Sequence, residues 1–121
     1  MDQHPTTIPA AALHILLALG TEERHGYAIM REVEHMTAGA TRMGPGTLYT
    51  AIQKLLTSGL VEESAERPDP ALDDERRRYY RVTAAGREVV RAETRRLAAL
   101  IERARSQGLA TSSGGSVRES A

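Results

Sequence analysis

The chain has 121 residues and a mass of 13.2 kDa, which suits one small domain. It contains no cysteine, so disulfides, thiolate metal sites and cysteine nucleophiles are excluded. Lys and Arg number 16, as do Asp and Glu, and we see no signal peptide and no apolar run long enough for a membrane span, so we expect a cytoplasmic protein.

The charges are unevenly distributed along the chain. Residues 1–75 hold five basic and twelve acidic side chains, whereas residues 76–105 hold ten arginines and three glutamates. A net charge of zero taken alone argues against a nucleic-acid-binding protein. The local potential, however, decides where a polyanion binds. The segment after residue 75 therefore keeps nucleic-acid binding open.

The first predicted helix begins near Pro9, which suits a first helical turn, and ends at a glycine stop at Gly20. It is apolar on nearly all sides, so we expect it to be buried on more than one face. The following TEERHG is typical of a polar turn. A second helix is predicted from Gly26 to Met36, where apolar residues recur at core spacing.

A third helix is predicted over residues 45–57, with Gly44 as N-cap, Pro45 at the first helical position and Gly59 as the left-handed stop. Its apolar residues fall on one face. The opposite face carries hydrogen-bonding groups, one cation and no acid. Its residues are Thr47, Thr50, Gln53, Lys54 and Thr57, with Tyr49 at the edge.

A hairpin is predicted next, with LVEES and RRRYYRV as its arms and a loop rich in proline and acids between them. Strand alternation sends Tyr80 and Val82 toward the core and leaves Arg76, Arg77 and Arg78 near the tip. There these arginines could contact phosphate or a minor groove. Alternatively, they are a solvated run of charges that the neighbouring acids partly neutralise.

Thr83 is predicted to cap a last helix that ends near Gly108. Val90, Thr94, Leu97, Ile101 and Ala104 lie at heptad spacing, which indicates a seam with another helix. That helix is either in a second subunit or the first helix of the same chain. Residues 108–121 are rich in Ser and Gly and are expected to be a disordered tail.

The order helix, helix, helix, strand, loop, strand, helix is that of a winged helix-turn-helix. We therefore predict a mainly α fold with a small β-hairpin, the wing, and a long C-terminal dimerisation helix. The expected parts are a DNA-binding domain over residues 8–82, the dimerisation helix over residues 83–107 and the tail.

Three segments in this order resemble the PadR family of bacterial transcriptional regulators: HGYAIMREV (25–33), GPGTLYTAIQKLLTSGLVEE (44–63) and RRYYRVTAAGREVV (77–90). The single helix after the wing is similar to the short subfamily. The resemblance implies a homodimer that binds operator DNA as a repressor, and a small molecule that relieves repression. One departure is Gly44, a weaker N-cap than the Ser or Asp that the family often has there.

Two sets of contact residues follow. Hydroxyl, amide and cationic side chains can bond base edges or phosphates, so the expected DNA contacts are Tyr27, Thr47, Tyr49, Thr50, Gln53, Lys54, Arg76, Arg77 and Arg78. The resemblance implies that the first and last helices form the dimer contact, and the residues expected there are Leu13, Leu16, Leu17, Val90, Thr94, Leu97, Ile101 and Ala104.

The alternative function is a winged-helix module that binds protein, with its acidic loop repelling DNA. An enzyme is not expected, because the sequence shows no nucleophile–base pair, carboxylate pair or phosphate loop. The four histidines have no metal-ligand spacing, so we expect no metal site and no cofactor. A structural hydrogen bond is the expected role of His25.

Overall fold

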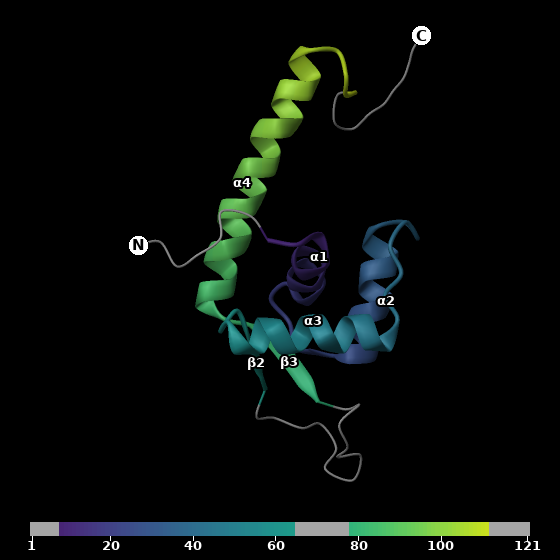
Figure 1. Ribbon diagram of the computed structural model, residues 1–121, viewed down its shortest axis with the longest axis vertical. Coiled ribbons are helices and arrows are strands. Elements are labelled where there is room, and N and C mark those ends of the chain that lie inside the picture. Colours follow the sequence, from purple (N-terminus) through teal and green to yellow (C-terminus); the bar gives the residue numbers. More distant parts are fainter. Residues whose placement is uncertain (1–7, 65–77, 112–121) are drawn as a thin grey trace.

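The computed structural model describes residues 8–64 and 78–111, which form four helices and three short strands. In chain order these are α1 (Ala10–Leu19), β1 (Arg24–His25), α2 (Gly26–Met36), α3 (Pro45–Thr57), β2 (Val61–Glu63), β3 (Tyr79–Val82) and α4 (Ala84–Ser106) (Figure 1). The predicted mainly α fold with a small β element is therefore confirmed. Most of the predicted tail lies outside the described residues.

The ends of α3 follow from glycine and proline chemistry, as predicted. Gly44 is the N-cap in an extended conformation, and Pro45 occupies the first turn, where its missing N–H removes no helical hydrogen bond. After the C-cap Ser58, Gly59 adopts φ 79°, a left-handed conformation that glycine reaches without a Cβ clash. These residues therefore set the start and the end of α3.

The core lies where α1, α2 and α3 meet. Its fully buried side chains are Ile15, Leu16, Leu19, Ile29, Val33, Leu48 and Ile52. Ile15 and Leu19, Ile29 and Val33, and Leu48 and Ile52 are each four residues apart, so the members of each pair lie on the same side of their helix. Val61, Tyr80 and Val82 cover this core from the sheet, and the predicted inward direction of Tyr80 and Val82 is confirmed.

The sheet has three antiparallel strands in the order β1-β3-β2. Val61 pairs with Val82 and Glu63 with Tyr80, while Arg24 pairs with Tyr80 from the other side. The interpretation of TEERHG as only a polar turn was wrong, because its last residues before α2 form β1. Two residues are too few to show the alternation by which strands are recognised.

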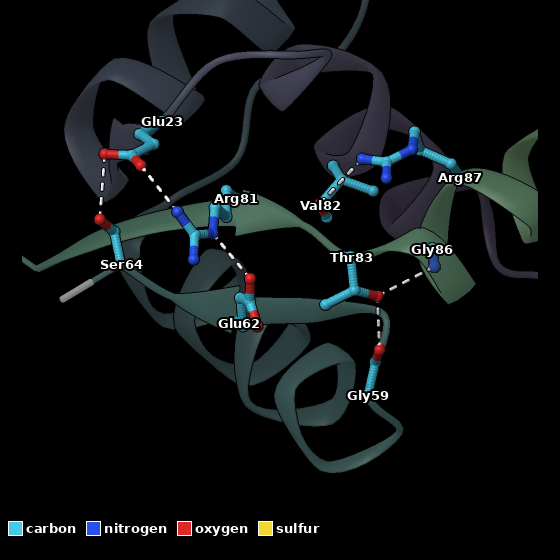
Figure 2. A network of polar contacts seen from close by, with 9 residues as sticks. All are labelled: Glu23, Gly59, Glu62, Ser64, Arg81, Val82, Thr83, Gly86 and Arg87. Carbon is cyan, nitrogen blue, oxygen red and sulfur yellow. Dashed lines mark hydrogen bonds and ion pairs between the residues drawn. The ribbon is translucent and has the colours of Figure 1, made fainter.

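The start of α4 is held against the end of α3 by Thr83 (Figure 2). The hydroxyl of Thr83 accepts a hydrogen bond from the Gly86 N–H at 3.0 Å and donates one to the Gly59 carbonyl at 2.6 Å. The Thr83 N–H also donates to the Leu60 carbonyl at 3.0 Å. A Cβ on Gly86 would clash with that carbonyl, so the two segments approach more closely than any other residue would allow.

Among the described residues, the first half of α4 packs on the rest of the chain and the second half does not. In Figure 1 the helix passes α1, and its C-terminal half extends with no other described helix beside it. Leu100 is 53% exposed and Ile101 50% exposed on that half. Within the two described ranges, none of the helices combines the length and hydropathy needed to cross a membrane.

Candidate nucleic-acid interface

The exposed face of α3 combines the polar residues that the sequence singled out. Leu48, Ile52 and Leu55 are buried on the opposite side. The exposed residues are Thr47, Thr50, Gln53, Lys54 and Thr57. No acidic residue occurs in the helix, and within the described residues Lys54 makes no ion pair. This face can donate to and accept from base edges while one cation remains available for phosphate.

Tyr49 anchors α3 on the start of α2. A Cβ added to Gly26 would fall inside the contact distance of the Tyr49 hydroxyl, so this ring needs glycine beneath it. Tyr49 is half-buried and packs against the core, so it positions α3 whether or not it also reaches DNA.

His25 holds the start of α2 in place. Its Nδ1 accepts a hydrogen bond from the Ala28 N–H at 3.2 Å, which makes His25 the N-cap of the helix. Its ring also meets Tyr79 edge to face, with the centroids 5.4 Å apart. The predicted structural role of His25 is confirmed, and the contact with Tyr79 ties α2 to the sheet.

Tyr27 projects from the first turn of α2 and is 59% exposed. The guanidinium carbon of Arg31, one turn later, lies 5.8 Å from the centre of its ring, within the range of a cation–π contact. Tyr27 was among the predicted DNA contacts, but its contact with Arg31 was not predicted. The spacing of four residues on a helix was the available signal.

The wing arginines have different surroundings. Nη1 of Arg78 donates to both carboxylate oxygens of Glu63, at 3.1 and 3.2 Å. The positive charge of Arg78, which was expected to contact phosphate, is thus partly neutralised by Glu63. Only the acids of the loop were expected to have this effect. Arg76 and Arg77, the other two predicted contacts, lie outside the described residues.

A second ion-pair network joins the wing to the turn before β1 (Figure 2). Nε of Arg81 donates to Glu62 at 2.7 Å, and its Nη1 donates to Glu23 at 3.1 Å. Ser64 donates to the other oxygen of Glu23 at 3.0 Å. The hydrogen bond with Glu62 is the main cause that raises the pKa of Arg81 above its usual value. No short-range pattern indicates this network, since Glu23 and Arg81 are 58 residues apart.

The predicted dimer residues differ in how much of each is accessible. Leu13 and Leu16 are 9% and 1% exposed, so they pack inside their own chain and leave little surface for a partner. Val90 packs against the same core. Leu17 at 45% exposure and Ile101 at 50% remain accessible.

The other three predicted dimer residues lie further along α4. Thr94 is exposed but bonds back to the Val90 carbonyl at 2.8 Å. Leu97 and Ala104 are half-buried. These two, with Leu17 and Ile101, therefore remain the apolar candidates for a contact outside the subunit.

A buried carboxylate lies on the inner side of α4. Glu93 is 4% exposed, and Arg96 donates to its two oxygens at 3.2 and 2.6 Å. This hydrogen-bonded pair lowers the pKa of Glu93. The burial of this carboxylate was not predicted. Among the described residues no group of three His, Cys, Asp or Glu side chains could hold a metal ion.

Two curated relatives are similar in sequence. Transcriptional regulator Rv3488 of Mycobacterium tuberculosis is 33% identical over 88 residues, which cover 73% of this chain and 76% of that protein. An uncharacterized 37.1 kDa protein in transposon TN4556 of Streptomyces fradiae is 34% identical over 90 residues, which cover 74% of this chain. The matched part spans only 24% of the Streptomyces protein.

Solved structures share the fold. RosR of H. salinarum matches with a TM-score of 0.62 and 28% identity, over 84% of this chain and 89% of that one. Bacillus subtilis PadR in complex with operator DNA matches with a TM-score of 0.57 and 18% identity, over 68% of this chain and 45% of that one. The second likeness is one of fold alone.

The model of the transcriptional regulator PadR-like family matches residues 15–92. This range runs from the core of α1 through α3 and the wing into α4. It contains all three segments in which the resemblance was first seen, and the family is one of regulators, not of enzymes. The chain therefore belongs to the transcriptional regulator PadR-like family.

Proposed function

We propose that this regulator is a homodimeric repressor that binds double-stranded operator DNA through α3 and the wing. The acid-free exposed face of α3 carries the proposal. A helix surface that rests in water normally mixes both signs of charge, whereas a surface for a polyanion excludes acids. The family membership and the operator complex of the Bacillus protein support the same reading.

The second subunit is inferred from α4. Leu100 and Ile101 in its C-terminal half are about half exposed, and no other described helix lies beside that half (Figure 1). A helix of this kind usually gains its stability by packing against another chain. A twofold dimer would present two α3 helices, so the operator should be roughly palindromic. Release by a small-molecule inducer completes the proposal.

The test is a mobility-shift titration with DNA from upstream of the gene, repeated at several salt concentrations. We expect binding that weakens steeply with salt, because phosphate contacts release counterions. Lys54→Glu should abolish most of this binding. The matched control is Arg95→Glu, which makes the same charge change on the exposed side of α4.

Size-exclusion chromatography with light scattering measures the subunit number of the same samples. A monomer would contradict the proposed assembly. Salt-insensitive or absent DNA binding by a folded dimer would favour the alternative, a winged-helix module that binds protein.

A further inference from the structure

A groove of about 900 Å³ lies beside the proposed DNA-binding face, between the start of α1, one side of α3 and the first turns of α4. Its walls are mainly apolar and include Ile8, Ala12, Leu60 and Val89. Small-molecule sites typically enclose roughly 300–1,000 Å³ and combine apolar walls with a few polar groups. The groove therefore has the size and lining of a ligand site.

The polar groups of the groove select the chemistry of its occupant. Lys54 is the one charged residue among the described residues that line it, and hydroxyls of Thr47, Thr50 and Ser58 lie along the same wall. No carboxylate lines it, and within residues 8–64 and 78–111 no acid pairs with Lys54. A fully apolar occupant would desolvate this ammonium without replacing its hydrogen bonds.

We propose that the groove binds a small amphipathic anion, with its apolar part between Ile8 and Val89 and its anionic group on Lys54. The exposed half of α4 from a second copy fits less well, because its Arg103 makes no ion pair among the described residues and would meet Lys54 with like charge.

The proposal rests on the proposed function and adds a mechanism of release. Three residues line the groove and also belong to the face proposed to bind DNA, namely Thr47, Thr50 and Lys54. An anion bound there neutralises the cation of α3 and covers two of its hydroxyls. Ligand and DNA then compete for the same side chains, and release needs no rearrangement of the subunits.

The site is tested without DNA by fluorescence titration of the full chain with two probes of similar shape. Anilinonaphthalene sulfonate is an amphipathic anion, and phenylnaphthylamine lacks the charge. We expect Lys54→Met to weaken binding of the sulfonate about tenfold and to leave the neutral probe unchanged, because a hydrogen-bonded charge pair is lost only for the anion. Equal effects on both probes, or no binding of the sulfonate to wild type, would overturn the proposal.

A charge placed in the groove locates the site. Ala11→Glu adds an acid to the α1 wall, and Ala10→Glu adds the same acid one position earlier, outside the lining. Both lie in the first turn of α1, where an acid favours the helix. Ala11→Glu should lower sulfonate affinity at least tenfold, and Ala10→Glu should leave it unchanged. Val89→Glu, on the opposite wall, should repeat the loss, and equal affinities in all variants would place the probe elsewhere.

The same variants separate this inference from the proposed function. The sulfonate should displace DNA from wild type and from Ala10→Glu, and should fail to displace it from Ala11→Glu, which still binds DNA. DNA binding without displacement at saturating probe would overturn the competition alone. Probe binding without any DNA binding would overturn the proposed function and leave the ligand site intact.

Discussion

The two halves of the proposed DNA surface differ in how their cations are held. On α3, Lys54 has no carboxylate partner among the described residues. In the described part of the wing, Arg78 is bonded to Glu63 and Arg81 to both Glu62 and Glu23. The wing has more positive side chains, but each of these two is already neutralised. The number of cations in a segment is therefore a poor guide to its attraction for phosphate.

This difference suggests a division of roles. An arginine in an ion pair has a fixed side-chain direction and little long-range electrostatic potential. An unpaired lysine keeps both its potential and its side-chain mobility. We expect α3 to supply sequence recognition and the main phosphate contact. The wing arginines that form ion pairs should mainly stabilise the contacts between the strands.

The largest effect is expected from the polar residues at the centre of α3. Gln53→Ala should weaken binding to the preferred operator by roughly tenfold to hundredfold and weaken binding to unrelated DNA very little, because an amide that reads a base edge carries sequence information. Thr50→Ala should act in the same direction. Binding selection from a random DNA library compares the preferred sequences of each variant with those of wild type. Unchanged preferences would remove these residues from base recognition.

A smaller, uniform effect is expected for the cation of α3. Lys54→Ala should weaken binding to every sequence about fivefold and reduce the slope of log affinity against log salt by about one, as for the loss of one phosphate contact. Arg78→Ala is the comparison, because its charge is already opposed by Glu63. Titrations from low to moderate salt measure both slopes. If Arg78→Ala changed the slope as much as Lys54→Ala, the distinction between the two regions would fail.

A modest gain is expected when the wing pair is opened. Glu63→Gln removes the acid that faces Arg78 and should raise DNA affinity about twofold to fivefold at low salt, with a steeper salt dependence. Glu88→Gln on the exposed side of α4 is the matched control, since it removes the same charge from an ion pair with Arg91 outside the wing. A loss of affinity in Glu63→Gln would show that the pair orients Arg78 for contact.

The smallest effect is expected at the network on the other side of the wing. Arg81→Ala should leave DNA affinity within about twofold of wild type, because the charge lost was shared by two glutamates. It should lower the melting temperature slightly, since Glu23 and Glu62 then repel each other without a cation between them. Thermal unfolding by circular dichroism and a mobility shift on the same sample give both values.

Local signals accounted for most of the fold. Gly44, Pro45 and Gly59 bounded α3, and Thr83 capped α4, because cap and turn chemistry acts within a few residues. The β1 strand was missed because two residues carry no pattern. Burial of the first helix was predicted, but a helix that is apolar all round does not show which of its residues, such as Leu13 and Leu16, pack against the same chain.

The candidate site was predictable only in part. The composition of the α3 face is a helical pattern, so the sequence contained it. Which wing arginines meet acids depends on strand register and on contacts such as Glu23 with Arg81, which no short-range rule predicts. The groove has the same origin, because its walls come from three helices that only the folded chain brings together.

The hydrogen bonds of Thr83 have a geometric consequence for the proposed dimer. They fix the beginning of α4 to the end of α3. In the proposed dimer, a change in the crossing angle of the two α4 helices would therefore also rotate the two α3 helices. Neighbouring half-sites on DNA are separated by one helical turn of about 34 Å or its multiples. In the proposed dimer, the contacts of Thr83 would thus link the geometry of the subunit contact to the distance between the two half-sites of the operator.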